Sequence, residues 1–178
     1  NRLLDFMPRI KDAPRMIAWC QDRIKQQPDW IGLRLGLAEL YRQQQDNELW
    51  VKTLEEARSR VDEPDGQAFI DRRLSTAYLV AGKTQQAIEV LRRLVQTQPK
   101  NVDILNNLAY LLLEQKEDIG EALKLAERAY DLAPTQATVM DTYALALLET
   151  KDYNKAEWIL RRAIQQLQRD SESVTPEY

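Results

Sequence analysis

Hydrophobic and polar positions recur along this chain in long, similar segments. Residues 74–99, 108–134 and 143–168 superpose with at most one residue of slip, and residues 37–57 follow the same template. Self-similarity at a period of roughly 20–50 residues is the sequence signature of a repeat architecture. The pattern therefore predicts a stack of repeated units.

Small residues mark the register of this repeat, one set in the first half of each unit and one in the second. The two sets are Ala38, Ser75, Ala109 and Ala144, then Ala87, Ala122 and Ala156. Successive gaps are 37, 34 and 35 residues in the first set and 35 and 34 in the second. A large side chain at such a position would force overpacking, so we expect helices to approach closely there.

Between these small residues the apolar positions have helical spacing, as in Leu74 and Tyr78 or in Leu91 and Leu94. Gly82 and the prolines 99 and 134 stand where helices should end. Each unit therefore reads as two amphipathic helices. The predicted helices cover residues 14–27, 31–44, 47–61, 67–81, 84–97, 102–115, 120–133, 137–149 and 153–168.

The repeat resembles the tetratricopeptide repeat family, whose unit is a pair of antiparallel helices of about 34 residues. The best-matched unit carries the resemblance at Leu74, Ser75, Tyr78, Gly82, Ala87, Leu91, Leu94 and Pro99. The next two units repeat it at Ala109, Ala122, Ala126, Ala129 and Pro134, then at Ala144, Tyr153, Ala156, Leu160 and Ala163. The register style resembles long bacterial repeat proteins, including those of envelope and exopolysaccharide systems.

The resemblance implies an all-α fold, a right-handed superhelical α-solenoid of antiparallel helix pairs with about four and a half repeats. We expect one domain over residues 1–178, with repeats at about 14–30 (partial), 31–67, 68–101, 102–136 and 137–170. Residues 171–178 would start a further segment. The chain begins at Asn1 without an apolar leader, so we expect a fragment of a longer protein.

Two departures from the family pattern stand out. The early tryptophan of the family is replaced by Arg34, Asp71, Leu105 and Met140. Trp50 stands where a small alanine normally lets two helices approach. The 37-residue spacing around residues 61–66 predicts that this joint opens to fit the indole ring.

The amino-acid composition argues against some classes of binding partner. The net charge of −3 argues against nucleic acid, since phosphate binding draws on a surplus of Lys and Arg. The Arg-Arg pairs at 72–73, 92–93 and 161–162 have acidic residues nearby and read as solvated helix faces.

The longest apolar run is six residues, so no membrane insertion is expected. Cys20 reads as a buried thiol, and the compartment stays open between cytoplasm and bacterial periplasm.

The sequence lacks several residues and motifs that enzymes use for catalysis. The chain has no His, the usual general base and commonest zinc ligand, and no glycine-rich phosphate loop. Gly32 and Gly36 read as helix-packing positions, and the acidic residues around Pro64 lack the ligand spacing of a calcium loop. We therefore expect no enzyme activity, no cofactor and no metal site.

The family resemblance implies that the first helix of each unit lines a concave surface. The groove residues on that surface would be Leu35, Glu39, Arg72, Thr76, Asn106, Tyr110, Asp141 and Leu145. The family's clamp for the C-terminal carboxylate of chaperones is not matched here, because Glu39 would repel a carboxylate.

The resulting hypothesis is a protein-interaction scaffold that binds a peptide or protein segment in its groove, within a larger protein or assembly. Two alternatives stay open. The repeats could instead serve as a structural spacer or as a module that self-associates through its repeat ends. They could also be an accessory domain of an enzyme whose catalytic part lies elsewhere.

Overall fold

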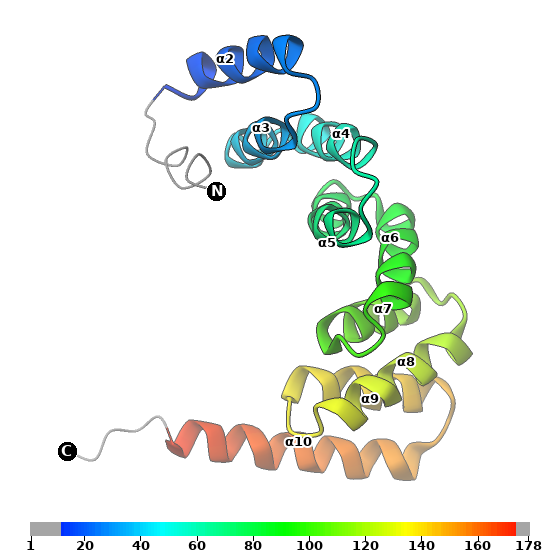
Figure 1. Cartoon of the computed structure of the whole chain (residues 1–178). Coiled ribbons are helices and arrows are strands. Elements are labelled where there is room, and N and C mark those ends of the chain that lie inside the picture. The colour runs from blue at the N-terminus through cyan, green and yellow to red at the C-terminus, as the bar shows by residue number, and fades with distance from the viewer. Residues whose placement is uncertain (1–11, 174–178) are drawn as a thin grey trace, which may run out of the picture. The chain divides into compact units, whose positions relative to one another are not determined.

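The computed structural model describes residues 12–173, and this part of the chain is entirely helical, with nine helices and no strand (Figure 1). The helices are α2 (Ala13–Gln26), α3 (Ile31–Gln43), α4 (Asn47–Arg58), α5 (Pro64–Val80), α6 (Thr84–Thr97), α7 (Val102–Gln115), α8 (Ile119–Leu132), α9 (Ala137–Glu149) and α10 (Tyr153–Ser173). The predicted all-α fold is confirmed, and most helix ends lie within one residue of the prediction.

The predicted and observed boundaries differ at the end of α10, which reaches Ser173, and on both sides of the long joint between α4 and α5. Helix α4 ends at Arg58 and α5 begins at Pro64, three residues before its predicted start. Proline suits the first turn of a helix because its missing N–H would have no intrahelical partner there. Helix α5 has 17 residues, against 13 in α3 and 14 in α7. The longer repeat spacing is thus taken up by an extra first turn of α5.

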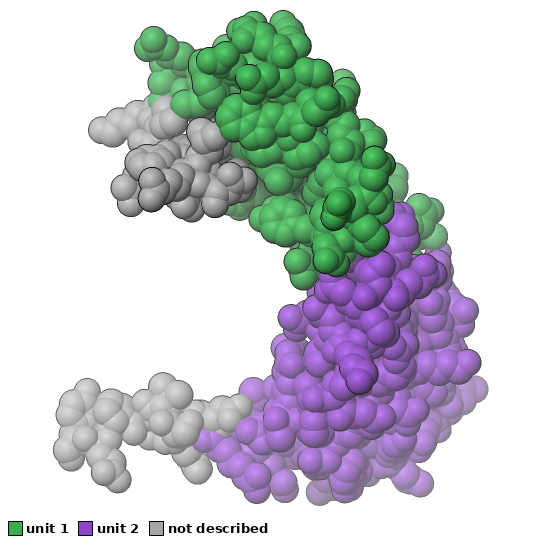
Figure 2. Space-filling model, in the orientation of Figure 1, with its two compact units in different colours: residues 1–90 green, residues 91–178 purple. Residues whose placement is uncertain are grey.

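Contacts divide the chain into two compact units, residues 1–90 (unit 1) and 91–178 (unit 2), coloured separately in Figure 2. The division falls within α6, and each unit is described by itself below. The single domain expected over residues 1–178 stays a prediction. Helix α10 continues to Ser173, and residues 174–178, where a further segment is expected, lie outside the described part.

Small residues hold the helix pairs together. In unit 2, α7 packs on α8, α8 on α9 and α9 on α10. Ala122 and Ala156, each the fourth residue of its helix, are completely buried at these contacts. The equivalent Ala87 in unit 1 is also completely buried, whereas Trp50 occupies the fourth position of α4 and is 7% exposed.

Each first helix ends in the same left-handed turn. The residue with positive φ is Gln45, Gly82, Lys116 or Lys151, with φ between 53° and 71°. The next amide bonds back to the carbonyl five residues earlier, as from Lys83 N to Tyr78 O at 2.8 Å. The cap predicted at Gly82 is confirmed. The three non-glycine residues adopt the same strained conformation because the repeat geometry requires it.

The second helices begin with a matching cap. The carboxylates of Asp46, Asp118 and Asp152 accept hydrogen bonds from the amides of Leu49, Glu121 and Lys155, at 2.9–3.2 Å. An aspartate at this position satisfies one of the amides that the helix cannot pair, and its charge suits the positive end of the helix dipole. Together the two caps fix the short turns between α3 and α4, between α7 and α8 and between α9 and α10.

The residues that replace the family tryptophan are all buried. Leu105 and Met140 are apolar, but Arg34 and Asp71 place charges in the core of unit 1. Arg34 donates a hydrogen bond to the carbonyl of Pro28. Asp71 accepts one from Arg58 Nε at 2.9 Å. Asp71 is thus paired with a cation, as a buried charge generally requires, whereas Arg34 is held by a carbonyl and its buried Nε has no hydrogen-bond partner among the described residues.

Other sequence expectations can be placed on the fold. Cys20 is buried, and burial raises the pKa of its thiol to about 11. Arg92 pairs with Glu121 at 2.7 Å and Arg161 with Glu157 at 2.6 Å, as expected of solvated helix faces. Within residues 12–173, no helix is both long enough and apolar enough to cross a bilayer.

The packing makes a direct prediction at Ala122. Replacing it with leucine should lower the free energy of unfolding by about 1–3 kcal/mol, because the added carbons have no space between the helices. Urea unfolding followed by circular dichroism measures this change. Lys124→Leu on the exposed side of α8 is the matched control and should change stability by less than about 0.5 kcal/mol. Equal stability of the two variants would contradict this view of the helix contact.

Candidate functional site

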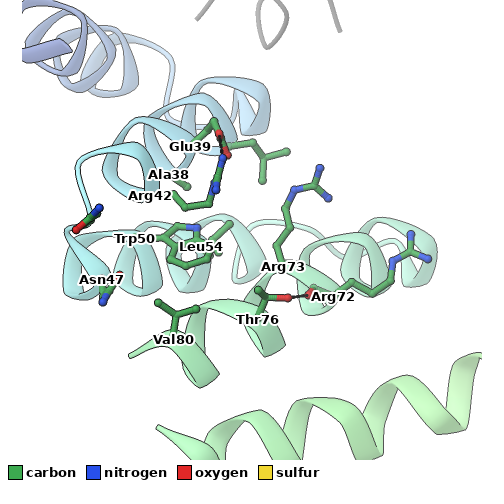
Figure 3. A pocket seen from close by; sticks show the side chains of 12 residues that line it. Ala38, Glu39, Arg42, Asn47, Trp50, Leu54, Arg72, Arg73, Thr76 and Val80 are labelled. Atoms are coloured by element: carbon green, nitrogen blue, oxygen red, sulfur yellow. Dashed lines mark hydrogen bonds and ion pairs between the residues drawn. The ribbon is translucent and has the colours of Figure 1, made fainter. Parts of the chain in front are cut away.

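Helices α3, α4 and α5 of unit 1 surround a cavity of about 710 Å³, shown in Figure 3 and named here the unit 1 cavity. Four of the eight predicted groove residues line it, namely Leu35 and Glu39 from α3 and Arg72 and Thr76 from α5. The other lining residues are Ala38, Arg42, Gln45, Asn47, Trp50, Leu54, Arg73 and Val80. The first helices of two successive repeats therefore contribute to one concave site.

One part of the unit 1 cavity is apolar. Ala38, Trp50 and Leu54 are buried, and Val80, at the end of α5, is 56% exposed. Helix α4 carries the bulky indole at the position where α6, α8 and α10 carry an alanine. The indole therefore lines the cavity at this joint, although most of it is buried.

The rest of the cavity wall is cationic. Arg42, Arg72 and Arg73 contribute three guanidinium groups, against the single carboxylate of Glu39. Glu39 is held by Arg42 through two hydrogen bonds, Nε to Oε2 at 2.9 Å and Nη2 to Oε1 at 2.6 Å. The hydrogen bonds from Arg42 hold the pKa of Glu39 below its usual value. Glu39 is therefore ionised and already paired within its own helix.

Arg73 is fixed on the cavity wall by its own helix. Its guanidinium carbon lies 3.8 Å from the centre of the Phe69 ring, in a cation–π contact, and Nη1 bonds the Phe69 carbonyl at 3.4 Å. Partial burial and the neighbouring charge of Arg72 lower the pKa of Arg73, while Glu39 acts in the opposite direction. The Arg73 guanidinium therefore lies near both a second positive charge and a carboxylate.

Beneath the cavity, polar contacts tie α5 to α4. The ion pair between Arg58 and Asp71 is joined by a hydrogen bond from Arg58 Nη2 to Gln67 Oε1 at 3.0 Å. Farther along, the Tyr78 hydroxyl donates to Glu55 at 2.7 Å. These contacts come from buried or half-buried positions on the opposite side of α5 from the cavity residues. They hold the helix that presents Arg72, Arg73 and Thr76 in a fixed rotation.

The other four predicted groove residues lie in unit 2, two on α7 and two on α9, helices that contact each other. Tyr110 is 41% exposed, and its pKa is raised by a hydrogen bond to Glu114 and by the charge of Asp141. Asn106 is half-buried, and its Oδ1 atom has no hydrogen-bond partner among the described residues. Leu145 is half-buried. This face is acidic and aromatic, unlike the wall of the unit 1 cavity.

Part of the unit 1 cavity is formed by residues that the repeat pattern does not single out. Arg42 and Val80 were not among the groove residues, although each follows a predicted one, Glu39 and Thr76, by one helical turn. Arg73 was grouped with the solvated arginine pairs, and here it lines a cavity instead. Trp50 was recognised as an exception in packing but not as part of a binding site.

The Glu39–Arg42 pair makes a testable prediction. Arg42→Gln should raise the pKa of Glu39 toward its ordinary value, because the main cause of its lowering is removed. A carboxyl group whose pKa is lower in the folded state than in the unfolded state stabilises the fold at pH values above the unfolded-state pKa. This stability is lost as the pH falls through the folded-state pKa, so the variant should lose less stability on acidification. The free energy of unfolding at neutral pH should change by no more than about 1 kcal/mol, since the pair is largely exposed.

Carboxyl carbon NMR titration of Glu39 measures this shift. Arg92→Gln, which breaks an arginine–glutamate pair in unit 2, is the control and should leave the Glu39 titration unchanged. An identical Glu39 titration in Arg42→Gln and in the unaltered chain would mean that the pair does not persist in solution.

Comparison with known proteins agrees with this architecture. A tetratricopeptide repeat family model matches residues 72–137. No curated protein sequence gives a match. Among solved structures, YrrB, described as a tetratricopeptide-repeat protein with an unusual peptide-binding site, is 15% identical with a TM-score of 0.76, covering 92% of this chain and 82% of its own.

Two structures of MamA are also similar. One is 14% identical with a TM-score of 0.75, covering 99% of this chain and 96% of its own. The other, from Desulfovibrio magneticus RS-1, is 11% identical with a TM-score of 0.76, covering 94% and 93%. At identities of 11–15%, these structures show only that the fold is shared. The repeat itself is identified by the family model. Residues 72–137 therefore match the tetratricopeptide repeat, and the solved structures show the same fold over most of the chain.

Proposed function

We propose that the unit 1 cavity binds an extended segment of a partner protein. The observation that carries this proposal is the cavity itself, about 710 Å³ in volume, with four of the predicted groove residues on its wall. A volume of this size lies within the range of about 300–1,000 Å³ typical of ligand sites. A single extended segment with a few side chains is a suitable occupant.

The side chains on the wall support binding rather than simple solvation. Arginine and tryptophan are enriched among the residues that dominate interface energies, and both types meet here. The hydroxyl of Thr76 lies between them and bonds the Arg72 carbonyl at 3.4 Å. An apolar wall flanked by polar groups can bury a partner's side chain and hold the backbone beside it.

The helices under the cavity are already held in place, which favours binding because little conformational entropy remains to be lost. The lining residues stand on helices, and the Arg58–Asp71 and Tyr78–Glu55 contacts limit the rotation of α5 against α4. A site that is already ordered loses little conformational entropy when a partner binds. YrrB, which shares the fold, is described as having a peptide-binding site, and this likeness agrees with the proposal. The proposal assigns the chain no catalytic role.

A second candidate function is self-association through the last described helix. Ile164 and Leu167 of α10 are 57% and 55% exposed, and Tyr153 and Trp158 are exposed on the same helix. In α8, the equivalent of Ile164 is Tyr130, whose ring packs on Tyr143 of the following helix at 5.2 Å between centroids. A concentration-dependent dimer in analytical ultracentrifugation, lost in Ile164→Ser with Leu167→Ser, would favour this alternative.

The leading proposal predicts the effect of filling the cavity. Thr76→Tyr places an aromatic ring in the space and should weaken cavity-binding peptides at least about tenfold, because the partner's contacts are blocked. Peptides are first selected with the purified chain from a random display library, and their dissociation constants are then measured by fluorescence anisotropy. Circular dichroism checks that Thr76→Tyr and the unaltered chain are equally helical.

Gln86→Tyr is the matched control, since Gln86 is exposed on α6 of the same unit and does not line the cavity. It should leave the same peptides within about twofold of the unaltered chain. Loss of binding in Gln86→Tyr, with full binding in Thr76→Tyr, would move the binding surface away from the unit 1 cavity.

A further inference from the structure

The charge of the unit 1 cavity differs from that of the chain around it. The chain as a whole carries a net charge of −3, yet the cavity wall holds three guanidinium groups and one carboxylate. Opposite charge attracts a ligand into a cleft more strongly than across open surface, because low-dielectric walls focus the field. The cavity is thus a local positive site on an acidic chain.

The carboxylate of Glu39 does not cancel this attraction. Both its oxygens accept hydrogen bonds from Arg42, and Oε1 also accepts one from Gln43 at 3.2 Å. The repulsion of a carboxylate expected from the sequence is therefore offset inside helix α3. Arg72 and Arg73 lie on the facing helix α5, and the pKa of Arg73 is lowered partly by the charge of Arg72. A ligand anion beside Arg73 would relieve that repulsion.

The positive and apolar parts of the cavity are separated along helix α5. Figure 3 shows Trp50 and Val80 toward one end of the cavity and Arg72 and Arg73 toward the other. Seven residues from Arg73 to Val80 correspond to about 10 Å at 1.5 Å per residue. An extended chain advances about 3.3 Å per residue, so about three residues span this distance.

We propose that the unit 1 cavity selects acidic peptide segments, with a Glu or Asp side chain beside Arg73 and a large apolar side chain about three residues away against Trp50 and Val80. This inference rests on the proposed function and names the chemistry of its ligand. Among the helix joints in the described part of the chain, the one between α3, α4 and α5 suits this ligand, because the second helices α6, α8 and α10 carry an alanine in place of Trp50.

The experiment uses a fluorescent Gly/Ser peptide with one glutamate and, three residues later, one phenylalanine. Its C-terminus is amidated so that the side chain supplies the only carboxylate. One comparison peptide replaces glutamate with glutamine, and a second replaces phenylalanine with serine. Anisotropy at low salt should give at least about tenfold weaker binding for the glutamine peptide, as expected for a lost charge-assisted hydrogen bond.

Two surface variants locate the two contacts. Arg73→Gln should remove the preference for glutamate over glutamine, and Val80→Ser should reduce the preference for phenylalanine over serine. Each variant should leave the other preference intact, which a double-mutant cycle measures. Arg23→Gln, an exposed arginine on α2 of the same unit, is the charge-matched control and should change neither preference. Binding of the glutamate peptide should weaken as salt rises.

The outcomes separate this inference from the function on which it rests. Cavity-binding peptides that respond to Thr76→Tyr but prefer glutamine or lysine to glutamate would overturn the acidic ligand and keep the proposed function. If no peptide responds to Thr76→Tyr, both proposals fail. Tighter binding of a short single-stranded oligonucleotide than of the glutamate peptide, with the same loss in Arg73→Gln, would also overturn the acidic peptide as the ligand.

Discussion

Close contact between helices at one small residue is the constraint on which the repeat packing depends. Ala87, Ala122 and Ala156 stand at the same place in the first turn of successive second helices, and each is completely buried. A methyl group there lets the neighbouring helix approach to its full contact, which buries the larger apolar residues on either side. The caps at both ends of the short intra-repeat turn keep the two helices in register.

Trp50 relaxes this constraint at one joint and creates the candidate site. The indole occupies the alanine position in α4 and lies on the wall of a cavity bounded by α3 and α5. Helix α5 is lengthened by a turn at its start, and its polar contacts with α4 fix the direction of its other face. The packing irregularity and the candidate site therefore meet at the same residue.

The charged residues of unit 1 fall into two groups, one in the core and one on the cavity wall. Arg34 and Asp71 occupy the tryptophan position of the family in the core, and each has a hydrogen-bond partner there. On the other side of α5, Arg72 and Arg73 line the cavity, where Glu39 is already paired with Arg42. Buried charges thus belong to the core, and exposed positive charge lies on the cavity wall.

The helices and their repeat can be predicted from the sequence alone, because small and apolar residues at a fixed period leave little choice of packing. It also placed Leu35, Glu39, Arg72 and Thr76 on one kind of helix face, and all four line the unit 1 cavity. That Arg73 and Trp50 also line the cavity is seen only in the folded chain. Their position depends on how α4 and α5 meet across an enlarged joint, and a periodic pattern carries no information about the space left around a side chain that breaks it.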